Sequence, residues 1–226
     1  MVNSEWRIAN NEWRIANNES AVVVRPATVE DMPRVGEVLI EGFSHKFGVV
    51  FGQRIGRAPR VLAQIERLRL ERGLCTLFVA QMDGRVVGVL NLSGRRERLS
   101  DLWGQLRIML RGVGPLYTLR ATVGLALLHE ETVENTAYVS DVAVATDFRG
   151  RGIGWRLLES AEGWAQAHGK ESLSLHVVVS NRARHLYERF GFRLEKRVEE
   201  WLAERLFGIR AWLYMVKPLS AGDDAE

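Results

Sequence analysis

Hydrophobic positions along the chain follow two different periods, one typical of strands and one typical of helices. Short β-branched or apolar runs predict strands at residues 22–24, 76–80, 86–92, 138–145, 173–179, 193–198 and 211–216. Between these runs, apolar residues recur at helical spacing, which predicts helices at residues 28–43, 56–72, 154–168 and 182–190. Because strands and helices alternate, we expect one mixed α/β domain.

Short polar motifs mark the ends of several of these elements. Thr28-Val29-Glu30-Asp31 places acidic residues in the first turn of a predicted helix. Asp83-Gly84 separates two strand-like runs and predicts a tight hairpin. Gly169 follows the helix predicted for residues 154–168 and is expected to end it.

Residues 99–134 depart from the alternation of strands and helices. Apolar residues at helical spacing, among them Leu102 and Trp103, are interrupted at residues 112–115, and a second apolar stretch follows. We expect a helical insertion that covers the substrate side of the molecule or packs against a partner subunit. A homodimer is therefore one hypothesis.

The two ends of the chain differ from the part between them. Residues 5–11 read EWRIANN and residues 12–18 repeat the same letters, but two copies are too few for a stacked repeat fold. We expect residues 1–20 to be a disordered extension, residues 21–218 a single domain, and residues 219–226 a disordered acidic tail.

Composition and charge narrow the class of protein. A chain of 226 residues with 46% hydrophobic and 26% charged residues is typical of a soluble globular protein. The single cysteine, Cys75, excludes an intramolecular disulfide and a cysteine-rich metal site; we expect it to be a buried apolar side chain, and we expect no metal. The net charge of +3, without long basic runs, favours a small phosphorylated ligand over nucleic acid. Without a secretory pattern or a long apolar run, we expect a cytoplasmic protein with no membrane partner.

A loop rich in glycine and arginine stands between the strand predicted at residues 138–145 and the helix that follows. It reads Arg149-Gly150-Arg151-Gly152-Ile153-Gly154. A helix N-terminus offers unpaired N–H groups and partial positive charge, glycines let the backbone approach a phosphate closely, and arginines add charged donors. The loop lacks the Gly-Lys-Ser/Thr of a Walker loop and does not fit a dinucleotide fingerprint. It predicts a diphosphate site, the alternative being a glycine-rich turn with solvated arginines.

This loop resembles the Gln/Arg-x-x-Gly-x-Gly/Ala loop of the GNAT family of N-acetyltransferases. Downstream, Leu186-Tyr187-Glu188-Arg189-Phe190-Gly191-Phe192 resembles the Leu-Tyr-x-x-x-Gly-Phe segment of that family. The resemblance covers roughly residues 22–217 and is strongest over residues 138–193. It implies a mixed, mostly antiparallel sheet of six to seven strands flanked by helices, with the helical insertion placed before a central splayed strand.

The resemblance also implies an activity. A protein of this family moves an acyl group from acetyl-CoA, its co-substrate, to the primary amine of a small molecule or peptide by direct attack. The alternative is a non-catalytic protein of the same fold that binds coenzyme A for regulation.

By the same resemblance, two groups of residues are expected to bind coenzyme A. The backbone of the splayed strand would pair with the pantetheine arm, at Val142, Ala143 and Val144. The pyrophosphate would lie over the loop formed by Arg149, Gly150, Arg151, Gly152, Ile153 and Gly154. The family commonly has an asparagine seven residues before its tyrosine; Ser180 stands there in this chain, and Asn181 follows, so either residue is a candidate.

Two residues are candidates for proton transfer. Tyr187 resembles the tyrosine that protonates the departing thiolate, which suits a phenol; the alternative is a tyrosine packed beneath coenzyme A. Asp141, an acid in an otherwise apolar strand, is the candidate general base, or else a structural carboxylate. His176, within a predicted strand, is expected to be a hydrogen-bonded core residue. The cluster of His129, Glu130, Glu131 and Glu134 either attracts a cationic amine or forms a solvated helix end.

Overall fold

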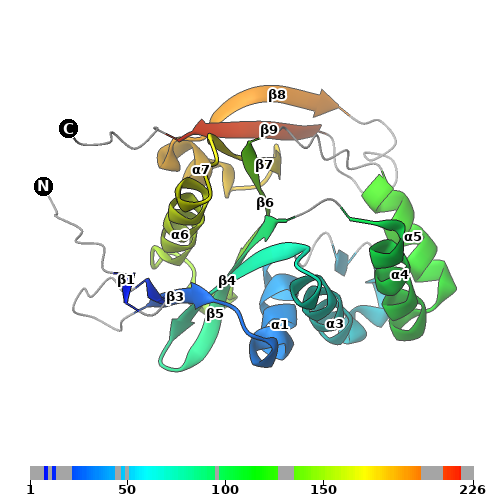
Figure 1. Cartoon of the computed structure of the whole chain (residues 1–226). Coiled ribbons are helices and arrows are strands. Elements are labelled where there is room, and N and C mark those ends of the chain that lie inside the picture. The colour runs from blue at the N-terminus through cyan, green and yellow to red at the C-terminus, as the bar shows by residue number, and fades with distance from the viewer. Residues whose placement is uncertain are drawn as a thin grey trace, which may run out of the picture.

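A computed structural model describes residues 8–9, 12–13, 22–43, 47–48, 51–94, 97–126, 135–199 and 211–219. Its centre is one twisted sheet with the strand order β1-β2-β3-β4-β5-β6-β7-β9-β8 (Figure 1). The strands are β1 (Ile8–Ala9), β2 (Glu12–Trp13), β3 (Val23–Pro26), β4 (Cys75–Met82), β5 (Arg85–Ser93), β6 (Thr136–Val144), β7 (Ser172–Val178), β8 (Arg193–Glu199) and β9 (Ala211–Pro218). Among these strands, β6 and β7 pair in parallel and the other neighbours pair antiparallel. The predicted mixed, mostly antiparallel sheet is confirmed, with β3 to β9 as its seven main strands.

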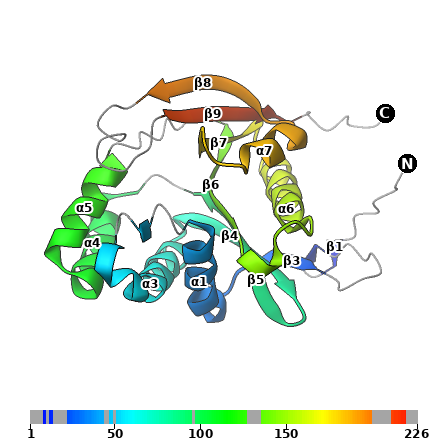
Figure 2. The same cartoon turned by 180° about the vertical axis from the view of Figure 1, so that it is seen from behind.

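Two helical layers cover the sheet (Figures 1 and 2). The helices are α1 (Met32–Gly42), α3 (Ala58–Glu71), α4 (Leu99–Val113), α5 (Pro115–Ala126), α6 (Ile153–Ala167) and α7 (Arg184–Phe190). Buried side chains of α1 and α3 pack on one face of β4, β5 and β6, whereas those of α6 and α7 pack on the opposite face. The predicted alternation of strands and helices is confirmed.

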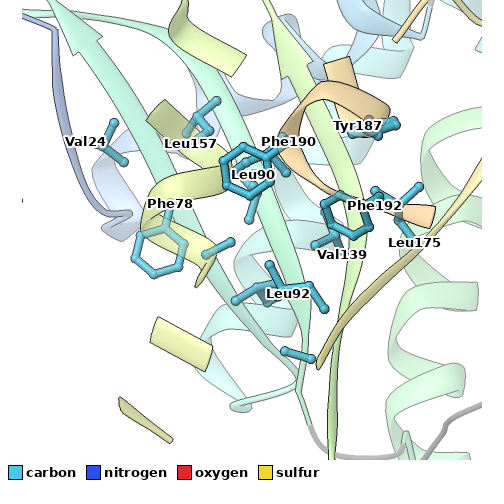
Figure 3. Packing of buried hydrophobic residues seen from close by; sticks show 14 of the residues in the cluster. Val24, Phe78, Leu90, Leu92, Val139, Leu157, Leu175, Tyr187, Phe190 and Phe192 are labelled. Carbon is cyan, nitrogen blue, oxygen red and sulfur yellow. The ribbon is translucent and has the colours of Figure 1, made fainter. Parts of the chain in front are cut away.

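The core on the α6 face is continuous from β3 to β9. Figure 3 shows Leu157 of α6 near Leu90 of β5, with Phe190 and Phe192 extending the same cluster toward Leu175 of β7. These residues recur at helical spacing in α6 and at alternate positions in the strands, so their apolar sides meet between the layers.

Local signals end the elements where the sequence predicts. Asp83 and Gly84 have φ of 50° and 75°, the left-handed conformations that a two-residue hairpin turn requires between β4 and β5. Gly169 has φ of 63° just after α6, and its N–H donates to the Gln166 carbonyl. A short 3₁₀ turn, Val29–Asp31, precedes α1 and confirms the predicted helix start.

The predicted insertion is a pair of helices, α4 and α5, separated at Gly114, which has φ of 82°. Helix α4 packs against α3, and large apolar side chains stay exposed on the pair, among them Leu99 and Trp103 on α4 and Leu116 on α5. The hypothesis that the pair contacts a partner subunit stays a prediction. No helix within the described ranges is long and apolar enough to cross a membrane.

Three expectations concern the regions around these elements. The two parts of the N-terminal extension that the structure describes form β1 and β2, and β2 pairs with β3. The prediction of disorder for residues 1–20 therefore does not hold for these two stretches. Of the acidic tail predicted at residues 219–226, only Leu219 is among the described residues; it is buried, and its N–H donates to the Glu171 carbonyl. The cluster of His129, Glu130, Glu131 and Glu134 lies outside the described residues.

Candidate active site

Strands β6 and β7 separate partway along their length. They pair from Thr136 and Ser172 as far as Val139 and Leu175, after which both strands continue without pairing to each other. Among the described residues, beyond this point β7 pairs only with β9, and β6 only with β5. The last part of β6 therefore presents an edge to which no described strand pairs on the β7 side.

A β-bulge lies at the point of separation. Leu92 of β5 pairs with Val139, but the preceding Asn91 pairs with Asp141, which leaves Ser140 as the extra residue. The Ser140 hydroxyl donates to the Asn91 carbonyl at 3.2 Å. A bulge increases local twist and bends the strand, so it accounts for the turning of β6 away from β7.

The direction of the backbone groups along β6 follows from the ladder with β5. The Ala145 N–H donates to the Val87 carbonyl at 2.8 Å. Because hydrogen-bonding direction alternates along an antiparallel strand, Ala143 also faces β5, whereas Val142 and Val144 face the open edge. The main-chain groups that point to this edge are thus those of Val142 and Val144, whereas those of Ala143 point toward β5.

The glycine- and arginine-rich loop follows β6 directly and opens α6. Gly150 and Gly152 have φ of 76° and 75°, and a Cβ at either position would meet no atom within 4 Å. The N–H groups from Gly150 to Trp155, which include those of Arg151, Ile153 and Gly154, have no hydrogen-bond acceptor among the described residues. Consecutive free donors at a helix N-terminus form a site for an anion.

The two loop arginines differ in what they contact. The Arg149 Nε donates to the Val144 carbonyl at 3.0 Å, and its Nη2 donates to the Glu41 carbonyl at 2.8 Å. Arg149 thereby ties the loop to β6 and to the end of α1. The Arg151 guanidinium lies 5.3 Å from the centroid of the Phe148 ring and makes no ion pair with a described residue. Arg151 is therefore the loop arginine whose charge is available to a phosphate.

Tyr187 lies in α7 on the α6 side of the sheet, with its ring 5.9 Å from that of Phe192 (Figure 3). It is 7% exposed, and its hydroxyl has no hydrogen-bond partner among the described residues. Burial raises the pKa of Tyr187, and the negative charge of Asp141 adds to the increase. The phenol therefore stays protonated at neutral pH.

Asp141 lies on β6 just past the separation from β7, directly opposite Asn91 in the ladder. It is half-buried, and its carboxylate has no hydrogen bond or ion pair with a described residue. Its charge contributes to the raised pKa of Tyr187, although the two residues differ in the face they occupy. Asp141 is on the α3 face of the sheet together with Asn91, whereas Tyr187 packs on the α6 face.

Ser180 and Asn181 lie in the turn between β7 and α7. The Asn181 Oδ1 accepts the Ala183 N–H at 2.9 Å, and the Asn181 N–H donates to the Val178 carbonyl at 2.8 Å. Asn181 thus shapes the turn, which leaves its side-chain N–H groups for a ligand. Ser180 is exposed.

A buried polar group behind Asp141 was missed by the sequence analysis. The Asn91 Nδ2 donates to the Glu66 Oε2 at 3.0 Å, and the Arg69 Nη1 donates to the Glu66 Oε1 at 3.3 Å. Burial raises the pKa of Glu66 although Arg69 opposes the shift. The sequence does indicate a buried acid here, because Glu66 stands four residues after Leu62 on the apolar face of α3.

Two other expectations can be checked here. Burial raises the pKa of the Cys75 thiol to about 12, which agrees with the prediction of a buried apolar residue and makes a thiolate nucleophile unfavourable. His176 shares a hydrogen bond of 3.1 Å with the Tyr138 hydroxyl and packs against the Tyr214 ring. It is hydrogen-bonded as expected, but it is half-buried and not part of the buried core.

Two observations concern other parts of the described molecule. A groove of about 520 Å³ between α1 and α3 is lined by residues that include Met32, Pro59 and Arg67, and it contains none of the candidates above. Within the described ranges, no group of three or more potential metal ligands gathers.

Comparison with known proteins gives both family and fold relatives. A sequence model of the Acetyltransferase (GNAT) family matches residues 47–192. An uncharacterized N-acetyltransferase from Methanocaldococcus jannaschii is 39% identical over 67 residues, which make up 29% of this chain and 30% of that protein. The chain thus matches under a third of the length of this curated relative.

Solved structures extend the likeness to nearly the whole domain. A histone acetyltransferase HPA2 and related acetyltransferase from Corynebacterium glutamicum has 24% identity and a TM-score of 0.61, with 89% of this chain and 98% of that chain covered. The PaiA N-acetyltransferase from Thermoplasma acidophilum, in complex with coenzyme A, has 16% identity and a TM-score of 0.56, with coverage of 87% and 98%. At these identities the likeness shows the fold alone.

The splayed strand pair and the loop that opens α6 define the fold of an N-acetyltransferase. Since the family match covers more than half of the chain, the protein belongs to the acetyltransferase (GNAT) family. The resemblance found in the sequence is confirmed.

Proposed function

We propose that the protein transfers an acetyl group from acetyl-CoA to the primary amine of a small molecule or peptide, by direct attack of the amine. The observation that carries the proposal is the run of N–H groups from Gly150 to Trp155, which lack acceptors among the described residues and lie beside the open edge of β6. Donors at a helix N-terminus suit a diphosphate, and an open strand edge suits an amide-containing arm. Acetyl-CoA has both.

Binding would use main-chain groups above all. The Val142 carbonyl and the Val144 N–H would pair with the pantetheine arm, since the Val144 carbonyl already accepts the Arg149 Nε. The loop amides and the exposed Arg151 would hold the diphosphate, and Ser180 or the side-chain N–H groups of Asn181 would add a further contact.

The chemistry would then divide among three groups. Asp141 takes a proton from the amine, because a carboxylate beside the reacting strand is a suitable base. The Val142 N–H stabilises the negative charge that develops on the thioester oxygen. Tyr187 gives its proton to the departing thiolate, for which a protonated, desolvated phenol is suited.

Replacement of Tyr187 by phenylalanine tests the assignment of the acid. We expect turnover with acetyl-CoA and an amine library, measured as released thiol, to fall about 100-fold, since general acid catalysis contributes effects of this order. Calorimetry should show an unchanged affinity for coenzyme A.

The matched control is Tyr117→Phe, which removes the same hydroxyl from a half-buried tyrosine of α5. It should leave turnover unchanged. Equal turnover in the wild type and Tyr187→Phe would remove the acid role. Binding of coenzyme A without thiol release for any amine would instead favour the regulatory alternative.

A further inference from the structure

The Asn91 side chain is buried and only half satisfied. It is 1% exposed, and its Nδ2 donates to the Glu66 Oε2 at 3.0 Å. Its Oδ1 is inaccessible to solvent and has no hydrogen-bond partner among the described residues. A buried acceptor without a partner is unfavourable and needs a physical reason.

On the β6 side, the neighbour of Asn91 in the sheet is Asp141. The two residues are directly opposite in the β5–β6 ladder. Side chains of opposite residues lie on the same face with their Cβ atoms about 5 Å apart. An ionised Asp141 can only accept hydrogen bonds, so it cannot satisfy the Asn91 Oδ1, whereas a protonated Asp141 can donate to it.

Glu66 determines which end of the Asn91 side-chain amide lacks a hydrogen-bond partner. Its carboxylate accepts from Asn91 and also from the Arg69 Nη1, at 3.3 and 3.5 Å. The Arg69 guanidinium favours the ionised form of Glu66 against the effect of burial. An ionised carboxylate can only accept hydrogen bonds, so it holds the NH₂ end of the amide toward α3. The oxygen end is thereby kept away from Glu66.

Several charged or titratable groups surround this site from different elements. Glu66 and Arg69 belong to α3, Cys75 to β4 and Tyr187 to α7, while Glu97 precedes α4. The charge of Asp141 acts on Glu66, Arg69, Cys75 and Tyr187. Glu97 lies 3.6 Å from the Arg69 Nε and accepts a hydrogen bond from Gln105. Carboxylates thus outnumber the one arginine in this group of residues.

We propose that Glu66 is a positioning residue for amine deprotonation: it orients the Asn91 amide so that the Oδ1 can accept a hydrogen bond from Asp141 once Asp141 has taken a proton from the substrate. The inference rests on the proposed function, in which Asp141 is the base. In this step an N–H bond of the protonated amine breaks, its electron pair stays on nitrogen for the attack, and an O–H bond forms on Asp141. The new O–H donates a hydrogen bond to the Asn91 Oδ1.

Substitution of Glu66 by glutamine reverses the orientation with little change in shape. The side-chain amide introduced by Glu66→Gln can donate to the Asn91 Oδ1, which turns the Asn91 NH₂ toward Asp141. A donor at that place stabilises the ionised carboxylate and makes it a weaker base.

The test is a ¹³C NMR titration of the Asp141 side-chain carboxyl, which needs no catalytic turnover. In Glu66→Gln we expect the midpoint to move to lower pH by about one unit, the size of one hydrogen bond to a charged group. The control Glu97→Gln removes a charge from the same cluster without touching Asn91, and its shift should be less than half as large. Shifts of equal size would overturn the proposal, because charge alone would then explain both.

A second variant separates orientation from charge more sharply. Asn91→Leu removes the acceptor in the wild type and should lower the titration midpoint of Asp141. In the Glu66→Gln background it removes a donor and should raise that midpoint. A shift of the same sign in both backgrounds would overturn the proposal. Thermal unfolding checks that each variant is folded.

Kinetics distinguish this inference from the proposed function. If Asp141 is the base, the acidic limb of the kcat/KM profile in Glu66→Gln should move in the direction of the NMR midpoint, and Asp141→Asn should lose most of its activity. Full activity in Asp141→Asn would refute the base assignment alone. The NMR titration would still decide whether Glu66 orients Asn91.

Discussion

Outside the candidate active site, the carboxylate of Asp31 accepts hydrogen bonds that join two elements of the fold. Its two oxygens accept hydrogen bonds from the Arg25 guanidinium at 2.7 and 2.8 Å, and from the Thr28 N–H at 2.8 Å. Burial alone would raise the pKa of Asp31, but the bonds from Arg25 and Thr28 lower it below its usual value. The residue thus joins β3 to the start of α1.

Asp31→Asn should lower the free energy of unfolding at neutral pH by about 2 kcal/mol, since it removes a charged hydrogen-bond pair. A depressed folded-state pKa means that this stabilisation is present above the unfolded pKa of about 4 and disappears as the pH falls through the folded value. Urea unfolding of the wild type and of Asp31→Asn, at neutral and at acidic pH, measures this difference in stability. The control is Glu30→Gln at the exposed neighbouring residue, which should change the free energy of unfolding little. If Asp31→Asn were still less stable than the wild type in acid, the ion-pair explanation would be contradicted.

At the scale of elements, the sequence predicts most where the signal is local. Asp83-Gly84 specifies its hairpin and Gly169 ends α6, because each supplies the left-handed backbone that its turn needs. Likewise the loop at residues 149–154 is recognisable from its glycines, arginines and position before a helix.

Structural features are harder to predict where they depend on residues that are far apart in the sequence. The separation of β6 from β7 depends on the bulge at Ser140, and nothing in the local sequence places that bulge. The partner of Glu66 is Asn91 in another element, so the pair becomes visible only in three dimensions. Similarly, the engagement of Arg149 by two carbonyls could not be inferred from the motif.

The loop provides a prediction at this scale through a pair of matched glycines. Gly152 and Gly169 both have positive φ, 75° and 63°, and both have free space where a Cβ would lie. Alanine at either position should destabilise the fold similarly, by about 1 kcal/mol, because L-residues disfavour this backbone. Only Gly152→Ala should also weaken binding of coenzyme A, about tenfold or more, because the loop amides would move. Calorimetry that found equal affinity in both variants would contradict the role of the loop as the diphosphate site.

At the scale of the whole molecule, the described residues form two cores on opposite faces of the sheet and a third, smaller cluster beside them. The third cluster includes Phe51, Ala58 and Val61 with Val113 of α4, so the insertion packs mainly on α3 and its preceding turn. Gly112 makes this contact close, because a Cβ there would collide with the Val61 side chain. Arg72 also donates to the Asp101 carboxylate of α4, and Arg54 donates to the Val113 carbonyl, so α3 and its preceding turn hold the insertion. Because these contacts lie outside the two main cores, the insertion is expected to open without unfolding the rest.

Gly112→Val tests this independence. The added side chain must push α4 away from Val61, which should destabilise that contact by about 1–3 kcal/mol. Hydrogen exchange should therefore increase across α4 and α5 and stay unchanged in β4, β5 and α6. The control is Gly56→Val, the same change at a glycine with no atom within 4 Å of the added Cβ and no positive φ. A uniform rise of exchange through the sheet in Gly112→Val would contradict this independence. It would mean that the insertion and the two cores unfold as one cooperative unit, because destabilising α4 would then destabilise the buried strands as well.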